Sequence, residues 1–426
     1  MVLEFRTSSS KAASLLLLAC LATLAGWLIV RPWAASFAIP ALPHDPELLR
    51  AWRSHPEHPQ YQHQHLGKIR QYSVSFQDYQ EALRHYRLAL RENPLSSRTW
   101  FDMARTHWWL GQVQEAKGAL RLALRFNPSN ARLRWESALF QIQLDDYEGA
   151  IANLRHLVMT EPSQRQTYFT LIHTLMRPAD FIDTTLPAEP GVLSDYLDYL
   201  IRQGEAENGR AVWQRLTGLP GIVLEPRLAL SYVDFMLEHK DLSGAMSAWN
   251  LLLRSRGIGR GDGDLDNLIW NGGFERDETW GAGFDWRVGR NAGVEIGVGA
   301  SSSTEGTRSL KIAFDGTRNL DLTAASQVVS VMPGTRYLLS GSIKPTGITT
   351  SNGPYFEVVD FLDGRRYATS ESYVGDHPWS DVRVPFETSP RSQAIIIKIR
   401  REASQKLDNL IGGTAWIDHV SLKKIH

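Results

Sequence analysis

The side chains best suited to acid–base chemistry in this sequence are carboxylates that occur a few residues apart. Asp360 and Asp363 form one such pair, and Glu275 and Asp277 form another. Two carboxylates can hydrolyse a glycosidic bond, but only at a defined separation in space, which sequence spacing does not provide. The sequence contains no G-x-S-x-G, H-E-x-x-H or P-loop pattern. We therefore expect a protein that is not an enzyme.

Asp418 is a carboxylate within an otherwise apolar pattern. In the stretch 415–422 it falls on the same alternate positions as Trp416, Val420 and Leu422. A carboxylate on the apolar face of a strand is costly unless it is paired, hydrogen-bonded or bound to a cation. Asp418 is thus either a cation ligand or a side chain that accepts hydrogen bonds.

Aromatic faces next to polar side chains are the groups that would bind a sugar in the C-terminal third. Tyr355 and Tyr367 flank a strand and a turn, where either ring could lie at the surface. Trp379 occupies a position whose side chain usually packs in the hydrophobic core. We predict a sugar site built from Trp280, Tyr355, Tyr367 and Tyr373, with packing in the core as the alternative.

A histidine-rich stretch occurs between residues 31 and about 65. Such a stretch can bind metal, but no acidic or cysteine side chain accompanies it at ligand spacing. We interpret it as a polar linker that leads into the first helix of the repeats. Its histidines are His44, His55, His58, His63 and His65.

From residue 265 onward the apolar pattern has a period of two, which is typical of half-buried antiparallel strands. Turn sequences at 333–335 and 363–365 separate apolar segments. Eight short strands in this region predict a two-sheet jelly roll. We expect them at 294–297, 309–314, 326–331, 336–343, 355–361, 381–386, 394–399 and 415–423.

Several phrases of this region resemble the jelly-roll carbohydrate-binding modules related to galactose-binding domains. They are 271–275, 284–286, 306–312, 327–337 and 415–422. Members of that family often hold a structural calcium ion with acids at two of these positions. The resemblance therefore implies Glu275 and Asp418 as calcium ligands, and oxygen atoms suit that ion. Hydrogen bonding of these acids to the backbone stays open as the alternative.

Upstream, a pattern of small and large residues recurs every 34 positions. Ala82, Ala116 and Ala150 are in register. Pro94, Pro128 and Pro162 repeat with the same step, and a proline ends a helix because it lacks an N–H. This stretch resembles the tetratricopeptide repeat family, in which each unit is a pair of helices. The resemblance implies a helical scaffold that binds proteins or peptides.

The repeat pattern weakens after residue 176. The segment 177–191 contains three prolines and is interpreted as a loop insertion. Ala211 and Ala245 are again 34 apart, which predicts two degenerate terminal units from helices near 193–203, 206–217, 226–239 and 242–254. We place the helical domain at 66–255, a glycine-rich linker at 256–264 and the sandwich at 265–426.

Residues 12–30 carry no charge and are just long enough to span a membrane. We predict a signal anchor, with a cleaved signal peptide as the alternative. Arg6 and Lys11 precede the span, so residues 1–11 would be a cytoplasmic tail and residues 31–65 an extracytoplasmic linker. This predicts a single-pass protein of the inner or plasma membrane whose bulk is extracytoplasmic, or periplasmic.

Composition limits the partners. Lys+Arg and Asp+Glu both number 46, so the chain has no excess of positive charge that would attract nucleic acid. We therefore do not expect it to bind nucleic acid. The architecture predicts a scaffold that binds a protein or peptide through its repeats and a polysaccharide through its sandwich. The pairing of two such domains suggests a role in envelope or exopolysaccharide assembly. A glycan-acting hydrolase and a purely protein-binding scaffold are the alternatives.

Overall fold

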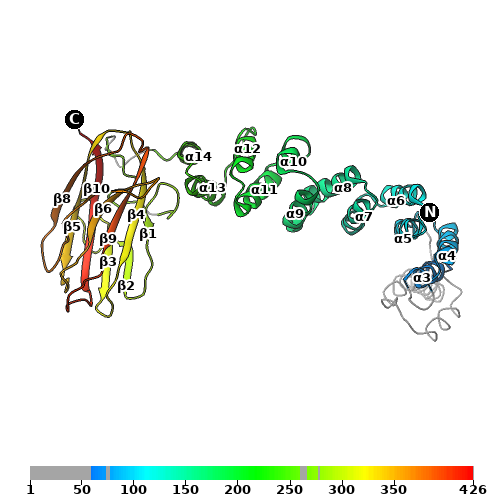
Figure 1. Cartoon of the computed structure of the whole chain (residues 1–426), viewed down its shortest axis with the longest axis horizontal. Coiled ribbons are helices and arrows are strands. Elements are labelled where there is room, and N and C mark those ends of the chain that lie inside the picture. The colour runs from blue at the N-terminus through cyan, green and yellow to red at the C-terminus, as the bar shows by residue number, and fades with distance from the viewer. Residues whose placement is uncertain (1–58, 73–76, 260–265, 277–278, 426) are drawn as a thin grey trace, which may run out of the picture. The chain divides into compact units, whose positions relative to one another are not determined.

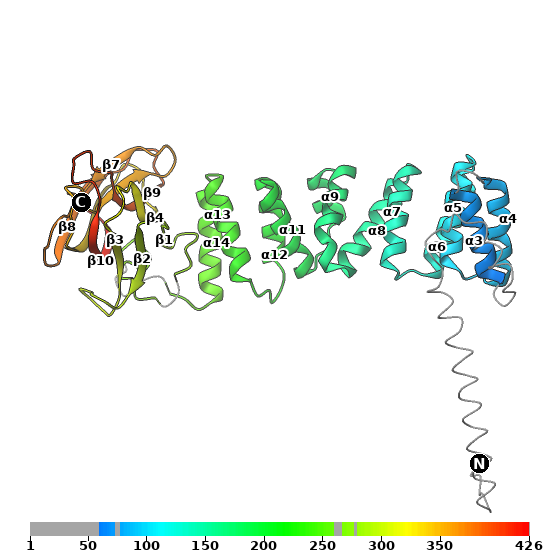
Figure 2. The same cartoon turned by 90° about the horizontal axis from the view of Figure 1, so that it is seen from below.

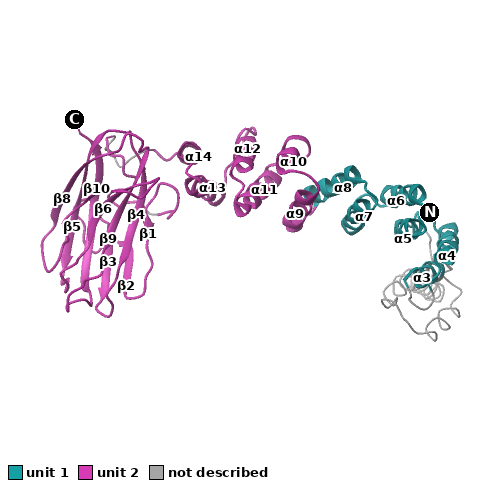
Figure 3. Ribbon diagram, viewed as in Figure 1, with its two compact units in different colours: residues 1–160 teal, residues 161–426 magenta. Residues whose placement is uncertain are grey.

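The computed structural model describes residues 59–72, 77–259, 266–276 and 279–425 (Figure 1). The chain divides into two compact units, residues 1–160 and 161–426 (Figure 3). The predicted membrane anchor at 12–30 lies outside the described residues. Within the described ranges, no helix is both long and apolar enough to cross a membrane.

In the described part of the first unit, the helices form pairs whose members lie side by side in both views (Figures 1 and 2). The pairs are α3 (Pro59–Tyr72) with α4 (Tyr79–Glu92), α5 (Ser97–Trp109) with α6 (Val113–Phe126), and α7 (Ala131–Gln143) with α8 (Tyr147–Thr160). The second helix of each pair ends at Glu92, Phe126 and Thr160 respectively. These ends are 34 residues apart and lie just before the three prolines, so the predicted period is confirmed.

The repeated residues of this unit form the contacts between helices. Ala82, Ala116 and Ala150 are all fully buried, and the large residues four positions later are buried beside them. Small side chains let two helix backbones approach, and the large neighbours fill the space that remains. Helices α4, α5 and α7 start at side-chain caps, as at Asp78, which accepts from the backbone N–H of Glu81 at 2.9 Å.

The helical part of the second unit begins with a single 3₁₀ turn and α9 (Arg165–Leu175). The predicted loop insertion at 177–191 is wrong in part, because it contains α10 (Pro178–Thr184). Pro178 is the first residue of that helix, a position that needs no N–H donor. The later helices are α11 (Pro190–Gln203), α12 (Ala206–Thr217), α13 (Pro226–Glu238) and α14 (Leu242–Ser255), close to prediction.

The 34-residue register predicted for Ala211 is wrong. Ala211 is exposed on α12, whereas Ala245 is fully buried on α14. The buried residues of α12 begin at Gly209, and each lies 36 positions before its counterpart on α14. The small residue that corresponds to Ala245 is therefore Gly209. Which residues are buried depends on the face that each helix turns to its neighbour, and not on a spacing of 34 residues.

Two five-stranded antiparallel sheets form the rest of the second unit. One has the order β1-β4-β9-β6-β7 and the other β2-β3-β10-β5-β8. All eight predicted strands are present, and β1 and β7 are short additions at the edges of the first sheet. The strands are β1 (Arg287–Val288), β2 (Val294–Gly299), β3 (Ser309–Asp315), β4 (Leu322–Ser330), β5 (Arg336–Thr346), β6 (Tyr355–Asp360), β7 (Arg366–Thr369), β8 (Ser380–Glu387), β9 (Ala394–Arg401) and β10 (Gly412–Lys424).

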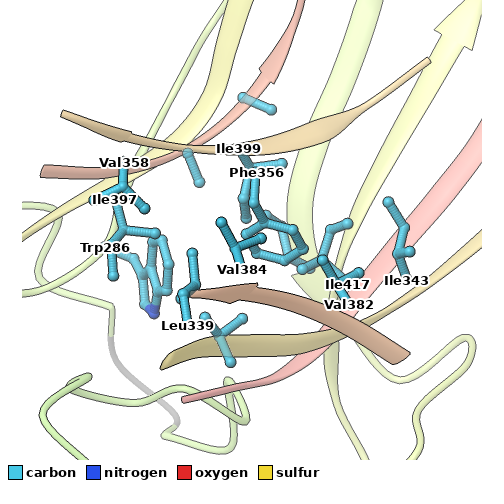
Figure 4. Packing of buried hydrophobic residues seen from close by; sticks show 14 of the residues in the cluster. Trp286, Leu339, Ile343, Phe356, Val358, Val382, Val384, Ile397, Ile399 and Ile417 are labelled. Atoms are coloured by element: carbon cyan, nitrogen blue, oxygen red, sulfur yellow. The ribbon is translucent and has the colours of Figure 1, made fainter. Parts of the chain in front are cut away.

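The core of the sandwich lies between the two sheets (Figure 4). Phe356 and Val358 of β6 enter it, as do Ile397 and Ile399 of β9. The residues that alternate with them on β6, Tyr355 and Glu357 among them, are therefore on the outer face of the first sheet. That face carries the candidate site described below.

Candidate functional site

A polar hollow lies at the edge of the first sheet, beside β6 and β7. Its volume is about 220 Å³. The side chains around it supply hydroxyl, amide and charged groups with a single aromatic ring. The lining residues are Asn352, Gly353, Tyr355, Arg366, Thr369, Ser370, Ser372 and Glu402.

Charged groups on the outer face of the sheet connect the hollow to a buried acid. The hydroxyl of Tyr355 donates to Oε1 of Glu402 at 2.8 Å, and Nη2 of Arg366 is 3.7 Å from the same oxygen. Nε of Arg366 also lies 2.7 Å from Oε1 of Glu357, which is only 2% exposed. Burial and the Glu402 carboxylate raise the pKa of Tyr355 to about 12, so its hydroxyl remains a hydrogen-bond donor at neutral pH.

Turns on either side of the hollow are held by hydrogen bonds. The N–H of Gly353 donates to Oγ of Ser372 at 2.7 Å, and that hydroxyl donates to the carbonyl of Gly353 at 3.1 Å. A Cβ on Gly353 would lie 1.8 Å from the carbonyl oxygen of Tyr373, so this close approach requires glycine. The hollow is thus built by backbone contact between two segments about twenty residues apart.

Arg401 supports the hollow from inside the sandwich. It is 1% exposed, and its guanidinium donates to the carbonyls of Leu320 and Asn352 and to Oδ1 of Asn319. Burial lowers the pKa of Arg401, with Asp321 opposing the shift. A buried cation that satisfies several carbonyls fixes the loops that carry the hollow.

Tyr355 is the one predicted sugar-site aromatic that lines the hollow. Tyr367 packs on Phe386, and its hydroxyl donates to Oδ2 of Asp360 at 2.8 Å. Tyr373 is half-buried and packs against the core of the sandwich. The sequence therefore predicted the strand correctly, but it did not separate the ring at the hollow from the rings that support it.

Trp280 belongs to a contact between the sandwich and the helices of the same unit. Its ring centroid lies 5.2 Å from that of Trp249 on α14, which also meets Trp270 and Phe284. Gly283 has φ +61, and a Cβ there would be 2.7 Å from Cζ3 of Trp249. Trp280 thus lies in an aromatic cluster apart from the hollow, while Trp379 is half-buried on the chain before β8.

Glu275 and Asp418 meet one loop from two sides. Oδ2 of Asp418 accepts from the N–H and hydroxyl of Thr304 at 2.7 and 2.9 Å and from the N–H of Glu305 at 3.3 Å. Oε1 of Glu275 accepts from the N–H groups of Thr307 and Arg308 at 2.9 and 2.8 Å. Sequence spacing could not reveal that both acids hold the loop between β2 and β3.

The face assigned to Asp418 needs correction. The register of β10 shifts between Asp418 and Ser421, and His419 has φ +49. Such a bulge moves the following residues to the other face, so Val420 and Leu422 enter the core while Asp418 remains with Trp416 on the outside. Asp418 is nevertheless fully buried, because the loop that it holds covers it.

The carboxylate oxygens of Glu275 and Asp418 fit a calcium site only in part. Carboxylates are suitable ligands, but N–H or O–H donors already face them. Although burial raises the pKa of Glu275, hydrogen bonds from Arg308 and Thr307 bring it below its usual range. In the ranges that the structure describes, no group of three or more His, Cys, Asp or Glu side chains could hold a metal. The arrangement as it stands is a hydrogen-bonded clamp.

A second candidate surface lies on the first helices of the pairs in the first unit. The guanidinium of Arg105 is 5.6 Å from the ring centroid of Tyr72 and 5.5 Å from that of Trp109. Asp102 is fully buried nearby, with Arg98 at 3.3 Å. Burial raises the pKa of Asp102, and Arg98 opposes the shift. Because the repeat pattern marks only positions that pack helices together, it did not predict this surface.

Comparison with known proteins supports the helical interpretation. Residues 74–134 match the family model described as a tetratricopeptide repeat, so the predicted resemblance is confirmed for these helices. No curated protein matches the chain significantly.

The chain also shows weak similarity to several solved structures. A CBM4 structure is 13% identical with a TM-score of 0.27, and the match covers 37% of this chain and 99% of that chain. The CBM22-1 xylan-binding domain from Paenibacillus barcinonensis is 15% identical with a TM-score of 0.23, over 33% and 85% of the two chains. The pilF protein of Pseudomonas aeruginosa is 19% identical with a TM-score of 0.22, over 46% and 91%. All three TM-scores are below 0.5, so these likenesses carry no argument about function.

Proposed function

We propose that this protein is a membrane-anchored extracytoplasmic scaffold that binds a partner protein through its helical repeats and a glycan at the polar hollow of its sandwich. The observation that carries the glycan part is the set of groups around that hollow. Hydroxyl, amide and carboxylate side chains beside a tyrosine ring form hydrogen bonds with a polyhydroxylated ligand. Arg366 already forms ion pairs with both Glu357 and Glu402, which favours binding over acid–base catalysis.

Glycan-array binding of the full chain tests this proposal. Tyr355→Phe removes one hydroxyl and Glu402→Gln removes its charged acceptor, and both variants should lose most of the binding. Glu371→Gln is the matched control, because Glu371 is exposed next to the hollow and does not line it. A chain that binds no glycan would leave a purely protein-binding scaffold. Release of reducing sugars from a bound glycan would instead favour the hydrolase.

The partner site is tested separately by cross-linking in cells. A photo-reactive residue at Arg105, between two aromatic rings, should capture a defined protein. The same residue at Arg121, which is exposed on α6, is the control and should not capture it. Equal capture from both positions would count against a partner on the first helices of the pairs.

The location is tested by a reporter fused after His426. An enzyme that is active only outside the cytoplasm should be active in this fusion, because Arg6 and Lys11 precede the apolar span. Activity of a cytoplasmic reporter instead would contradict the proposed orientation. Envelope or exopolysaccharide assembly is the setting in which a membrane-anchored protein of this kind would meet both ligands.

A further inference from the structure

Two histidines from neighbouring helices meet in the first unit. His63 of α3 and His85 of α4 have their Nδ1 atoms 3.2 Å apart, and their ring centroids are 5.4 Å apart. The two residues are separated by 22 positions in the chain, so only the packing of α3 on α4 brings them together. Neither residue belongs to the hollow or to the surface around Arg105.

The separation of the two nitrogens is that of two ligands on one metal ion. At a metal–nitrogen distance of about 2.0–2.1 Å, two ligands in a tetrahedral shell are about 3.3 Å apart. The observed 3.2 Å agrees with that value. A single proton held between the rings would give a similar distance, so further features of the site have to distinguish the two.

The surroundings of His85 favour a free lone pair at Nδ1. Its Nε2 lies 3.7 Å from Oε1 of Glu81, one turn earlier on the same helix. A carboxylate beside the second nitrogen retains the proton there, which is the usual outer partner of a metal-binding histidine.

We propose that His63 and His85 bind a divalent transition metal ion of the zinc, copper or nickel class through their Nδ1 atoms. Imidazole suits these ions, whereas calcium and magnesium prefer oxygen. Within the described ranges, no third His, Cys, Asp or Glu side chain joins the two imidazoles in a metal-binding group. The ion joins α3 to α4. Binding therefore stabilises this helix pair.

Zinc titration of the full chain against a chromogenic chelator tests this site, repeated with copper and nickel. The wild-type chain should bind zinc and melt at a higher temperature with zinc than with EDTA. His63→Ala and His85→Ala should each lose binding and the shift in melting temperature. Glu81→Gln should weaken binding by about tenfold or more. Circular dichroism of each variant in EDTA checks that the helices remain folded.

The matched control is His156→Ala, because His156 is a half-buried helical histidine outside the pair. It should bind zinc as the wild type does. Wild-type affinity in either His63→Ala or His85→Ala would overturn the site. So would a wild-type chain that binds none of the three metals, which would mean that the two rings share a proton.

Discussion

Replacing Asp418 with asparagine distinguishes a hydrogen-bonded clamp from a calcium site. The side chain keeps its size, but one of its two terminal atoms becomes an NH₂ donor. In the wild type, Oδ2 accepts three hydrogen bonds from the loop at 304–305, and Oδ1 accepts from the N–H of His419 at 2.7 Å. Either orientation of the amide therefore places a donor against a donor.

The expected cost follows from these contacts. In the better orientation the amide oxygen retains the loop, and the NH₂ group faces the N–H of His419. The NH₂ group and the N–H of His419 then both lack an acceptor in this contact, and the remaining bonds lose the charge of the acceptor. Since an unsatisfied buried group costs about 1–3 kcal/mol and a bond to a charged group contributes more than a neutral one, we expect a loss of about 2–4 kcal/mol in the free energy of unfolding.

Denaturant unfolding of the full chain, with EDTA and with calcium, measures this loss. The clamp predicts a large loss in EDTA and no effect of calcium on the wild type. Calcium held by Glu275 and Asp418 predicts the reverse, a wild type stabilised by calcium and a variant that loses little in EDTA. Asp363→Asn is the control, because Asp363 is exposed and accepts from the N–H of Arg365 in a turn. An unchanged Asp418→Asn variant in EDTA would refute the clamp.

Three other perturbations test the packing. Ala116→Leu should cost about 1–3 kcal/mol by overpacking a fully buried contact, and an unchanged melting temperature would contradict the register of the repeats. Gly283→Ala should destabilise the contact with Trp249, since its φ is +61 and a Cβ would clash; near-ultraviolet circular dichroism of the tryptophans should report the change. Burial raises the pKa of Asp285 to about 6, so the folded state binds its proton more tightly than the unfolded state. Its contribution to stability should therefore fall as pH rises from about 4 to about 6, and melting of the wild type relative to Asp285→Asn should change only in that window.

The order and type of the elements could be predicted because they depend on local patterns. The second helices of the pairs in the first unit end just before Pro94, Pro128 and Pro162. A proline has no N–H to continue the helical hydrogen bonds, and this effect does not depend on the rest of the fold. The eight strands follow a period of two that one buried face imposes. The short helix α10 and the edge strands β1 and β7 were missed, because a few residues carry too little pattern to predict an element.

The candidate sites could be predicted only as a set of residue types. Tyr355, Tyr367 and Tyr373 are alike in sequence, and their different roles depend on which ring the two polar turns enclose. The charged partners are far apart in the chain, since Arg366 begins β7 and Glu402 directly follows β9. Their polar neighbours at 351–352 and 369–372 are the one signal that sequence offered for this hollow.

The sequence by itself determined the helical period, the strands and the presence of an acid in an apolar stretch, since each depends on neighbours along the chain. Tertiary structure decided which groups face one another. A one-residue bulge at His419 puts Val420 in the core and leaves Asp418 under a loop, and the packing of α3 on α4 places His63 beside His85. A side chain's chemistry depends on the groups within a few ångströms of it. Residues that are far apart in the sequence reach that distance only when the chain folds.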